Sequence, residues 1–151
     1  MYRLTPPRLT FSPWYAWASR DQIDGWRYPG VYLVAITNAQ LSGKAPRWAD
    51  VCYIGMSNSK GGLCQRWAQF YNAVRGKKGH SGGNTIYLHL GHYERWRKKL
   101  FVAAMPVACD REQPGPKDFI KMGWVAFLEY KAFSEYCRRF PRRRKPRYNT
   151  H

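Results

Sequence analysis

Short apolar runs alternate along the chain with polar stretches rich in glycine and proline. Three of these runs, at 31–37, 51–56 and 100–105, are rich in β-branched or aromatic residues and too short for typical helices, so we expect them to be strands. The first run is apolar at every position but the last, which is typical of a central strand buried on both faces. The first two strands are expected to pair antiparallel through the long connection 38–50.

Apolar residues recur at helical spacing in two later segments. Residues 62–75 carry them three and four positions apart, which predicts a helix. A longer helix is predicted over 118–140, where Asp118 can cap the N-terminus and Pro141 ends the helix.

The remaining segments give weaker signals. A serine followed by a proline predicts a short helix over 13–20. The basic stretch 76–84 holds four glycines and is interpreted as a loop. Residues 85–97 fit either a helix or a strand.

The length of the chain bounds its organisation. With 151 residues, 44% of them apolar, it has the size of one domain with a buried core. We expect a main domain over 30–151 that ends in a basic tail, and an aromatic-rich extension over 1–29 that packs on it. The aromatics of the extension are interpreted as core residues, and the alternative is a platform on which nucleic-acid bases stack.

The charge of the chain narrows the range of partners. Lys and Arg number 26 against 9 Asp and Glu, which gives a net charge of +17. This balance argues against an enzyme of small neutral metabolites and indicates a polyanionic partner. The densest cationic run lies in the last fifteen residues, and a solvated, partly disordered segment is the alternative interpretation. The residues expected to contact nucleic-acid phosphates are Lys60, Lys77, Lys78, Arg138, Arg142, Arg143, Arg144, Lys145 and Arg147.

Two further features concern the compartment. The longest apolar run is about half a membrane span, and the N-terminus lacks the apolar stretch of a secretory signal, so we expect no membrane association. The four cysteines are widely spaced, and we expect reduced thiols in a cytoplasmic protein. A zinc site built from Cys52, Cys64, His80 and Cys109 is an alternative that no C-x-x-C pair supports.

The carboxylate of Glu129 has unusual surroundings. Its neighbours three and four positions away on the predicted helix are all apolar, and a carboxylate on a buried face needs an arginine, a metal ion or a raised pKa. Arg66 lies beside the apolar stripe of its own helix, so a salt bridge to Glu129 and a metal site at Glu129 are both open. By the two-residue period of strands, Tyr32 and Tyr53 can project into one space if the register allows it.

Five of these features occur in a fixed order along the chain. They are Gly30-Val31-Tyr32, Tyr53-Ile54-Gly55, Arg66, Glu129 and Asn149. This ordered set resembles the signature of the GIY-YIG nuclease superfamily, and the resemblance covers residues 30–149. It implies an α/β fold of the α+β type, with a small three-stranded antiparallel sheet flanked by helices. It also implies a divalent-metal-dependent endonuclease that hydrolyses phosphodiester bonds of double-stranded or branched DNA.

The same resemblance implies a role for each signature residue. Tyr32 and Tyr53 would bind and activate the attacking water, and Tyr32 is the expected general base. Arg66 would neutralise charge on the scissile phosphate, and Glu129 would ligate one Mg²⁺ or Mn²⁺ ion. Asn149 would support the site from the tail. A phenol is a poor base at its reference pKa of about 10, so a tyrosine base needs help from nearby cations or a metal-bound water.

Two features depart from the family pattern. The fourth residue after Arg66 is Phe70, where many members carry His or Tyr, and His80 is the candidate replacement for proton transfer. The connection 38–50 is longer than usual. Specificity is expected to come from this loop, the N-terminal aromatics, self-association or a protein partner. The competing interpretation is a non-catalytic basic DNA- or RNA-binding module that retains the nuclease fold.

Overall fold

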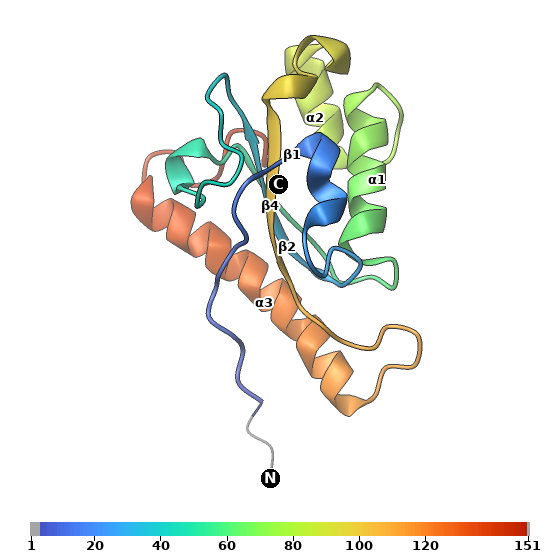
Figure 1. The fold of residues 1–151 in the computed structure, drawn as a ribbon. Helices are drawn as coiled ribbons and strands as arrows, with labels where there is room; N and C mark the ends of the chain where they lie inside the picture. Colours follow the sequence, from blue (N-terminus) through green and yellow to red (C-terminus); the bar gives the residue numbers. More distant parts are fainter. Residues whose placement is uncertain (1–3, 151) are drawn as a thin grey trace.

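A four-stranded antiparallel sheet is the centre of the computed structural model, which describes residues 4–150 (Figure 1). The strands are β1 (Tyr15–Ala16), β2 (Gly30–Ile36), β3 (Tyr53–Ser57) and β4 (Leu100–Pro106). Their order in the sheet is β1, β4, β2, β3, and every neighbouring pair is antiparallel. The fold is therefore α+β, with its two longest strands in the middle of the sheet.

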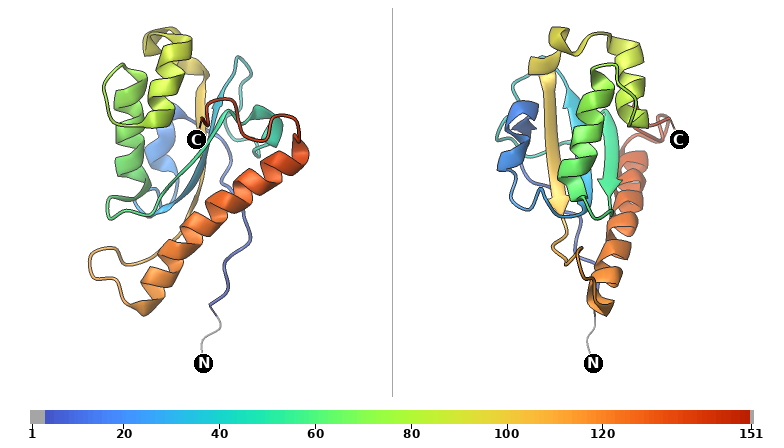
Figure 2. Two further views of the ribbon diagram at one scale, coloured as in Figure 1. Left: turned by 180° about the vertical axis from the view of Figure 1, so that it is seen from behind. Right: turned by 90° about the vertical axis from the view of Figure 1, so that its right-hand side faces the viewer.

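Helices cover both faces of this sheet. α1 (Gly62–Val74) and α2 (Ser81–Leu90) lie side by side on one face, and the long α3 (Pro116–Arg139) crosses the opposite face diagonally (Figure 2). No helix within residues 4–150 combines the length and the apolar character needed to cross a membrane. Short 3₁₀ helices complete the chain: η1 (Trp17–Gln22), η2 (Trp48–Asp50), η3 (Tyr93–Arg95) and η4 (Arg97–Lys99).

The sequence of β2 is apolar throughout because both of its faces are buried. Tyr32 and Val34 belong to the core that α1 covers, whereas Val31 and Leu33 belong to the core that α3 covers. Each of the four side chains is at most 1% exposed. The alternation follows from the two-residue period of a strand. The prediction of a central strand buried on both faces is confirmed.

The sheet has four strands where the sequence predicts three. The additional strand, β1, comes from the N-terminal extension, and its Tyr15 pairs with Val102 of β4. Two residues are too few for a hydrophobic alternation to be recognised. The helix expected over 13–20 is wrong, because this segment forms β1 and then the 3₁₀ helix η1. Trp14 and Trp17, on either side of β1, are each 1% exposed and pack into the core.

The two predicted long helices are present with small differences at their ends. α1 matches the expected range to within one residue. α3 begins at Pro116, so Asp118 lies inside the first turn and does not precede it. The Asp118 carboxylate still caps the N-terminus of α3, because its Oδ2 accepts a hydrogen bond from the N–H of Gly115 at 2.9 Å.

α2 begins inside the stretch 76–84 that the sequence predicts to be a loop. The ring of His80 caps this helix, because its Nδ1 accepts a hydrogen bond from the N–H of Gly83 at 3.0 Å. A Cβ at Gly82 would collide with the ring of Tyr53, and a Cβ at Gly83 would collide with α1. The glycines that indicate a loop are therefore the small residues that let α2 pack closely.

The glycine of Tyr53-Ile54-Gly55 has a packing role that a substitution can test. Gly55 pairs with Tyr32 in the β2–β3 register, and a Cβ at Gly55 would lie 2.5 Å from the Oη of Tyr32. We expect Gly55→Ala to lower the free energy of unfolding by about 1–3 kcal/mol, because the ring must move inside a packed core. Denaturant titration measures this change.

Gly123→Ala in the exposed middle of α3 is the matched control. Apart from the backbone of its own helix and its chain neighbours, no heavy atom lies within 4 Å of the position that a Cβ at Gly123 would take, so we expect alanine there to stabilise the protein by up to about 1 kcal/mol. Equal free energies of unfolding for wild type and Gly55→Ala would contradict the close packing of Gly55 on Tyr32.

Candidate active site

The register of β2 and β3 brings the two tyrosines together. Tyr32 pairs with Gly55, so Tyr53 lies two residues along on the same face of the sheet. The ring centroids of Tyr32 and Tyr53 are 6.1 Å apart. Tyr32 is fully buried, whereas Tyr53 is 7% exposed. The expectation that the two phenols project into one space is confirmed.

His80 joins the two phenols from the start of α2. Its Nε2 lies 2.9 Å from the Oη of Tyr32, and its Nδ1 accepts the N–H of Gly83. Because Nδ1 is an acceptor, the neutral ring carries its proton on Nε2 and donates it to Tyr32. Burial, followed by the positive charge of Arg66, lowers the pKa of His80 from 6.5 to about 3. The imidazole is therefore neutral at physiological pH and is a donor to Tyr32.

Four residues after Arg66, α1 carries Phe70, and the imidazole beside the tyrosines comes from the N-cap of α2. Phe70 is fully buried, and its ring packs edge-on against His80 with the centroids 5.2 Å apart. The His80 ring also lies 5.6 Å from that of Tyr53. The structure thus brings His80 to the tyrosines, as expected of the candidate replacement, although its role in proton transfer stays a prediction.

The low pKa of His80 makes a prediction for stability. As the pH falls below about 6.5, His80 is protonated in the unfolded chain but stays neutral in the folded protein. The contribution of His80 to the free energy of unfolding is therefore complete above about pH 6.5 and is lost as the pH falls. His80→Asn keeps an acceptor for Gly83 and removes the titrating ring. Between about pH 6 and pH 4 we expect wild type to lose about 1.4 kcal/mol more per pH unit than this variant. Urea unfolding at several pH values measures the difference, and parallel pH profiles would contradict it.

Arg66 carries the positive charge of this cluster. It is half-buried on α1, and its Nη1 donates to the Oε1 of Gln69 at 3.1 Å. Burial raises the pKa of Tyr32 well above 10 and also raises that of Tyr53, and in both cases the charge of Arg66 opposes the rise. A cation is therefore placed where it stabilises negative charge near either phenol.

Glu129 faces the tyrosines from α3. It lines a cavity of about 170 Å³ together with Tyr53, Ser81 and Asn149. Burial raises the pKa of Glu129, and the charge of Arg66 opposes this. Among the ion pairs of residues 4–150, none involves Glu129, so the salt bridge with Arg66 is not formed as a direct contact. The half-buried carboxylate is left pointing to the cavity without a counterion in contact.

Asn149 attaches the tail to β3. Its Nδ2 donates to the carbonyl oxygen of Ile54 at 2.8 Å, and its Oδ1 accepts the N–H of Ile54 at 2.9 Å. The amide therefore pairs with the outer edge of β3 like one residue of a further strand. The N–H of Tyr148 donates to the carbonyl of Cys52 at 2.9 Å, and Tyr148 is 3% exposed. Asn149 thus holds the backbone between Tyr53 and Gly55 in place.

The predicted phosphate contacts lie in four regions. Lys60 forms an exposed ion pair with Glu112 at 3.1 Å. Lys77 and Lys78 are exposed in the loop that leads to His80. Arg138 is exposed in the last turn of α3. The others lie in the tail, residues 141–150, where five cationic side chains are exposed: Arg142, Arg143, Arg144, Lys145 and Arg147.

The described residues hold one carboxylate at the cavity and no larger ligand cluster. Within residues 4–150, no three His, Cys, Asp or Glu side chains converge as a metal site, so the alternative zinc site is not formed. Mg²⁺ is commonly bound by one or two carboxylates, with water and substrate phosphates as the other ligands. A half-buried carboxylate with no ion-pair partner fits a site of that kind.

Some cavity residues were not predicted from the sequence. Ser81 and Gly82, at the start of α2, line the cavity beside Tyr53, and Thr150 lines it from the tail. The stretch that contains Ser81 and Gly82 is predicted to be a loop, so the sequence patterns predicted no place for these residues beside β3. The capping potential of His80 before two glycines is the pattern that indicates it.

Comparisons with known proteins leave the residues and their geometry as the basis for assigning a function. No protein-family model, no curated protein and no solved structure matches this chain.

Proposed function

We propose that the protein is a divalent-metal-dependent endonuclease of the GIY-YIG type that hydrolyses DNA phosphodiester bonds. The observation that carries the proposal is the convergence of Tyr32, Tyr53 and His80 beside the Arg66 charge, with Glu129 on the same cavity as Tyr53. These side chains come from two strands, two helices and the N-cap of a third helix, far apart in the sequence. The net charge of +17 supports a polyanionic substrate.

The different burial of the two tyrosines indicates a different role for each. Tyr53 lines the cavity and is the phenol that meets the attacking water, whereas Tyr32 lies fully buried behind it. The Oη of Tyr32 receives a hydrogen bond from His80, which leaves the proton of Tyr32 free to point toward Tyr53. We therefore propose Tyr53, in place of the expected base Tyr32, as the residue that accepts the proton of water. Tyr53 acts as a phenolate after losing its own proton to solvent through the cavity. The hydroxyl of Tyr32, which His80 holds, and the charge of Arg66 stabilise that phenolate.

Charge development explains the other residues. As the water oxygen bonds to phosphorus and the leaving oxygen departs, negative charge grows on the phosphate oxygens, and Arg66 is the protein cation that stabilises it. Glu129 would hold Mg²⁺ or Mn²⁺, and the bound ion would supply further stabilisation of that charge. Asn149 keeps the β3 backbone next to Tyr53 in register through both of its hydrogen bonds to Ile54.

Relaxation of supercoiled plasmid DNA by the purified protein tests the proposal. We expect nicked and then linear plasmid to accumulate with Mg²⁺. Tight DNA binding without any nicking would favour the non-catalytic binding module instead.

A further inference from the structure

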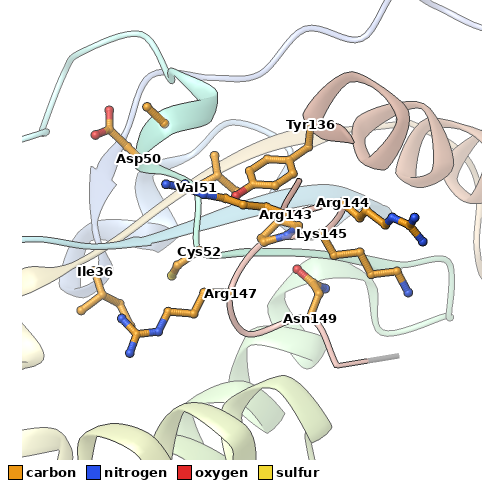
Figure 3. Close-up of a pocket in the computed structure, with 12 residues that line it drawn as sticks. Ile36, Asp50, Val51, Cys52, Tyr136, Arg143, Arg144, Lys145, Arg147 and Asn149 are labelled. Atoms are coloured by element: carbon orange, nitrogen blue, oxygen red, sulfur yellow. The ribbon is translucent and has the colours of Figure 1, made fainter. Parts of the chain in front are cut away.

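A second and larger cavity adjoins the candidate active site (Figure 3). Its volume is about 810 Å³, and Asn149 lines both this cavity and the smaller one that holds Tyr53 and Glu129. Arg143, Arg144 and Arg147 of the tail line the larger cavity, together with Lys145. Asn149 is therefore shared by the cavity of Glu129 and a strongly cationic hollow.

The electrostatics of this hollow select an anion. The one acidic residue on its wall, Asp50, forms an ion pair with Arg47 at 3.2 Å. The guanidinium of Arg143 lies 4.8 Å from the ring centroid of Phe140, and that of Arg147 lies 5.5 Å from that of Tyr148. Contact with a ring face orients a guanidinium and leaves its N–H donors at the edges available. Such donors match the oxygens of phosphate groups.

The backbone at the cavity is strained. Arg144 has a φ of 63°, and within residues 4–150 it is the only residue other than glycine with a positive φ. The N–H of Lys145 donates to the carbonyl oxygen of Arg143 at 2.7 Å, which closes a tight turn around Arg144. A left-handed conformation is unfavourable for a residue with a Cβ. Strain of this kind persists where the surroundings enforce it, and it is concentrated at functional sites.

We propose that this cavity binds backbone phosphates of the DNA strand that continues from the scissile phosphate past Asn149. The inference rests on the proposed function and adds the path of the substrate. Cationic residues line a hollow large enough for more than a single ion, and a strained turn holds Arg144 in place. The cavity of the candidate active site is only about 170 Å³. Contacts to the neighbouring phosphates would therefore add to the affinity for the DNA substrate.

Salt dependence of DNA binding tests the proposal. The protein carrying Glu129→Gln binds a fluorescein-labelled 20-bp duplex, and anisotropy is measured over a range of KCl concentrations. The logarithm of the binding constant falls with the logarithm of the salt concentration by about 0.9 per phosphate contact. We expect the added changes Arg143→Gln, Arg144→Gln and Arg147→Gln together to make this slope shallower by about 2.7.

A matched triple variant separates the cavity from the general charge. Arg95, Lys98 and Lys99 are exposed on the η3–η4 segment, and their change to Gln removes the same charge. We expect this control to keep most of the slope. Equal losses in the two triple variants, or no loss in the cavity variant, would overturn the proposal.

Arg144→Gly separates the side chain from the turn, since glycine adopts this φ without strain. We expect a slope shallower by about 0.9 and a melting temperature at or above that of wild type. A full slope in this variant would count against the role of Arg144. Cleavage by the wild-type protein is scored separately with Mg²⁺. Its absence would overturn the proposed function, while a slope lost in the cavity variants would still support phosphate binding there.

Discussion

Glu129→Gln is expected to lower the rate of DNA cleavage by at least about 10³-fold while DNA affinity is retained. The substitution keeps the shape of the side chain and removes the charge that would hold a divalent ion. The loss corresponds to the several kcal/mol of transition-state stabilisation that a metal ion supplies to phosphoryl chemistry. Single-turnover cleavage of a labelled duplex at saturating protein measures it.

The stability of this variant distinguishes lost chemistry from lost folding. Burial raises the pKa of Glu129, so its ionised form at neutral pH is less favourable in the folded protein than in the unfolded chain. We therefore expect Glu129→Gln to melt at the same temperature as wild type or higher at pH 7. Glu135→Gln, on the same helix but away from the tyrosines, is the control and should keep full activity. Cleavage by Glu129→Gln at more than a tenth of the wild-type rate would contradict the assignment.

Arg66→Gln is expected to slow cleavage by about 10²–10³-fold. Arg66 is the protein cation whose charge acts on Tyr32, Tyr53 and Glu129 together. Its loss removes stabilisation of the phosphate charge in the transition state, so the rate at saturating protein should fall more than the affinity. Single-turnover rates and anisotropy, measured on the same duplex, separate these two effects.

Arg75→Gln is the matched control for Arg66→Gln. Arg75 follows the last turn of α1, is exposed and packs on the ring of Tyr71 at 3.9 Å. Its removal takes the same charge from the protein without touching the tyrosine pair. Equal slowing by the two substitutions would mean that Arg66 acts only through the net charge.

Local sequence patterns were sufficient to predict the elements that carry most residues of the candidate site. The unbroken apolar run of β2 and the helical spacing of α1 placed Tyr32 and Arg66 on their elements. The apolar neighbours of Glu129 indicated its half-buried position. The meeting of Tyr32 with Tyr53 followed from the two-residue period once the strands paired in the expected sense.

The parts that sequence patterns missed depend on contacts between distant residues. β1 is two residues long, and it forms because Tyr15 pairs with β4. α2 packs closely on the sheet because Gly82 leaves room for the ring of Tyr53, and this contact between distant residues has no local signal. The cap that His80 provides is local, but it is visible only as a residue that precedes two glycines. The arginine run of the tail gave no sign that Tyr148 is buried among core residues. Such long-range packing overrides local propensity.

Metal dependence of cleavage by the wild-type protein tests the central claim most directly. Nicking of supercoiled plasmid is followed with Mg²⁺, with Mn²⁺ and with excess EDTA, beside Glu129→Gln under the same conditions. The proposed mechanism predicts nicking with either ion, none with EDTA, and recovery when Mg²⁺ is restored. Cleavage that persists in EDTA, or wild-type protein that binds the plasmid and never nicks it, would contradict the claim.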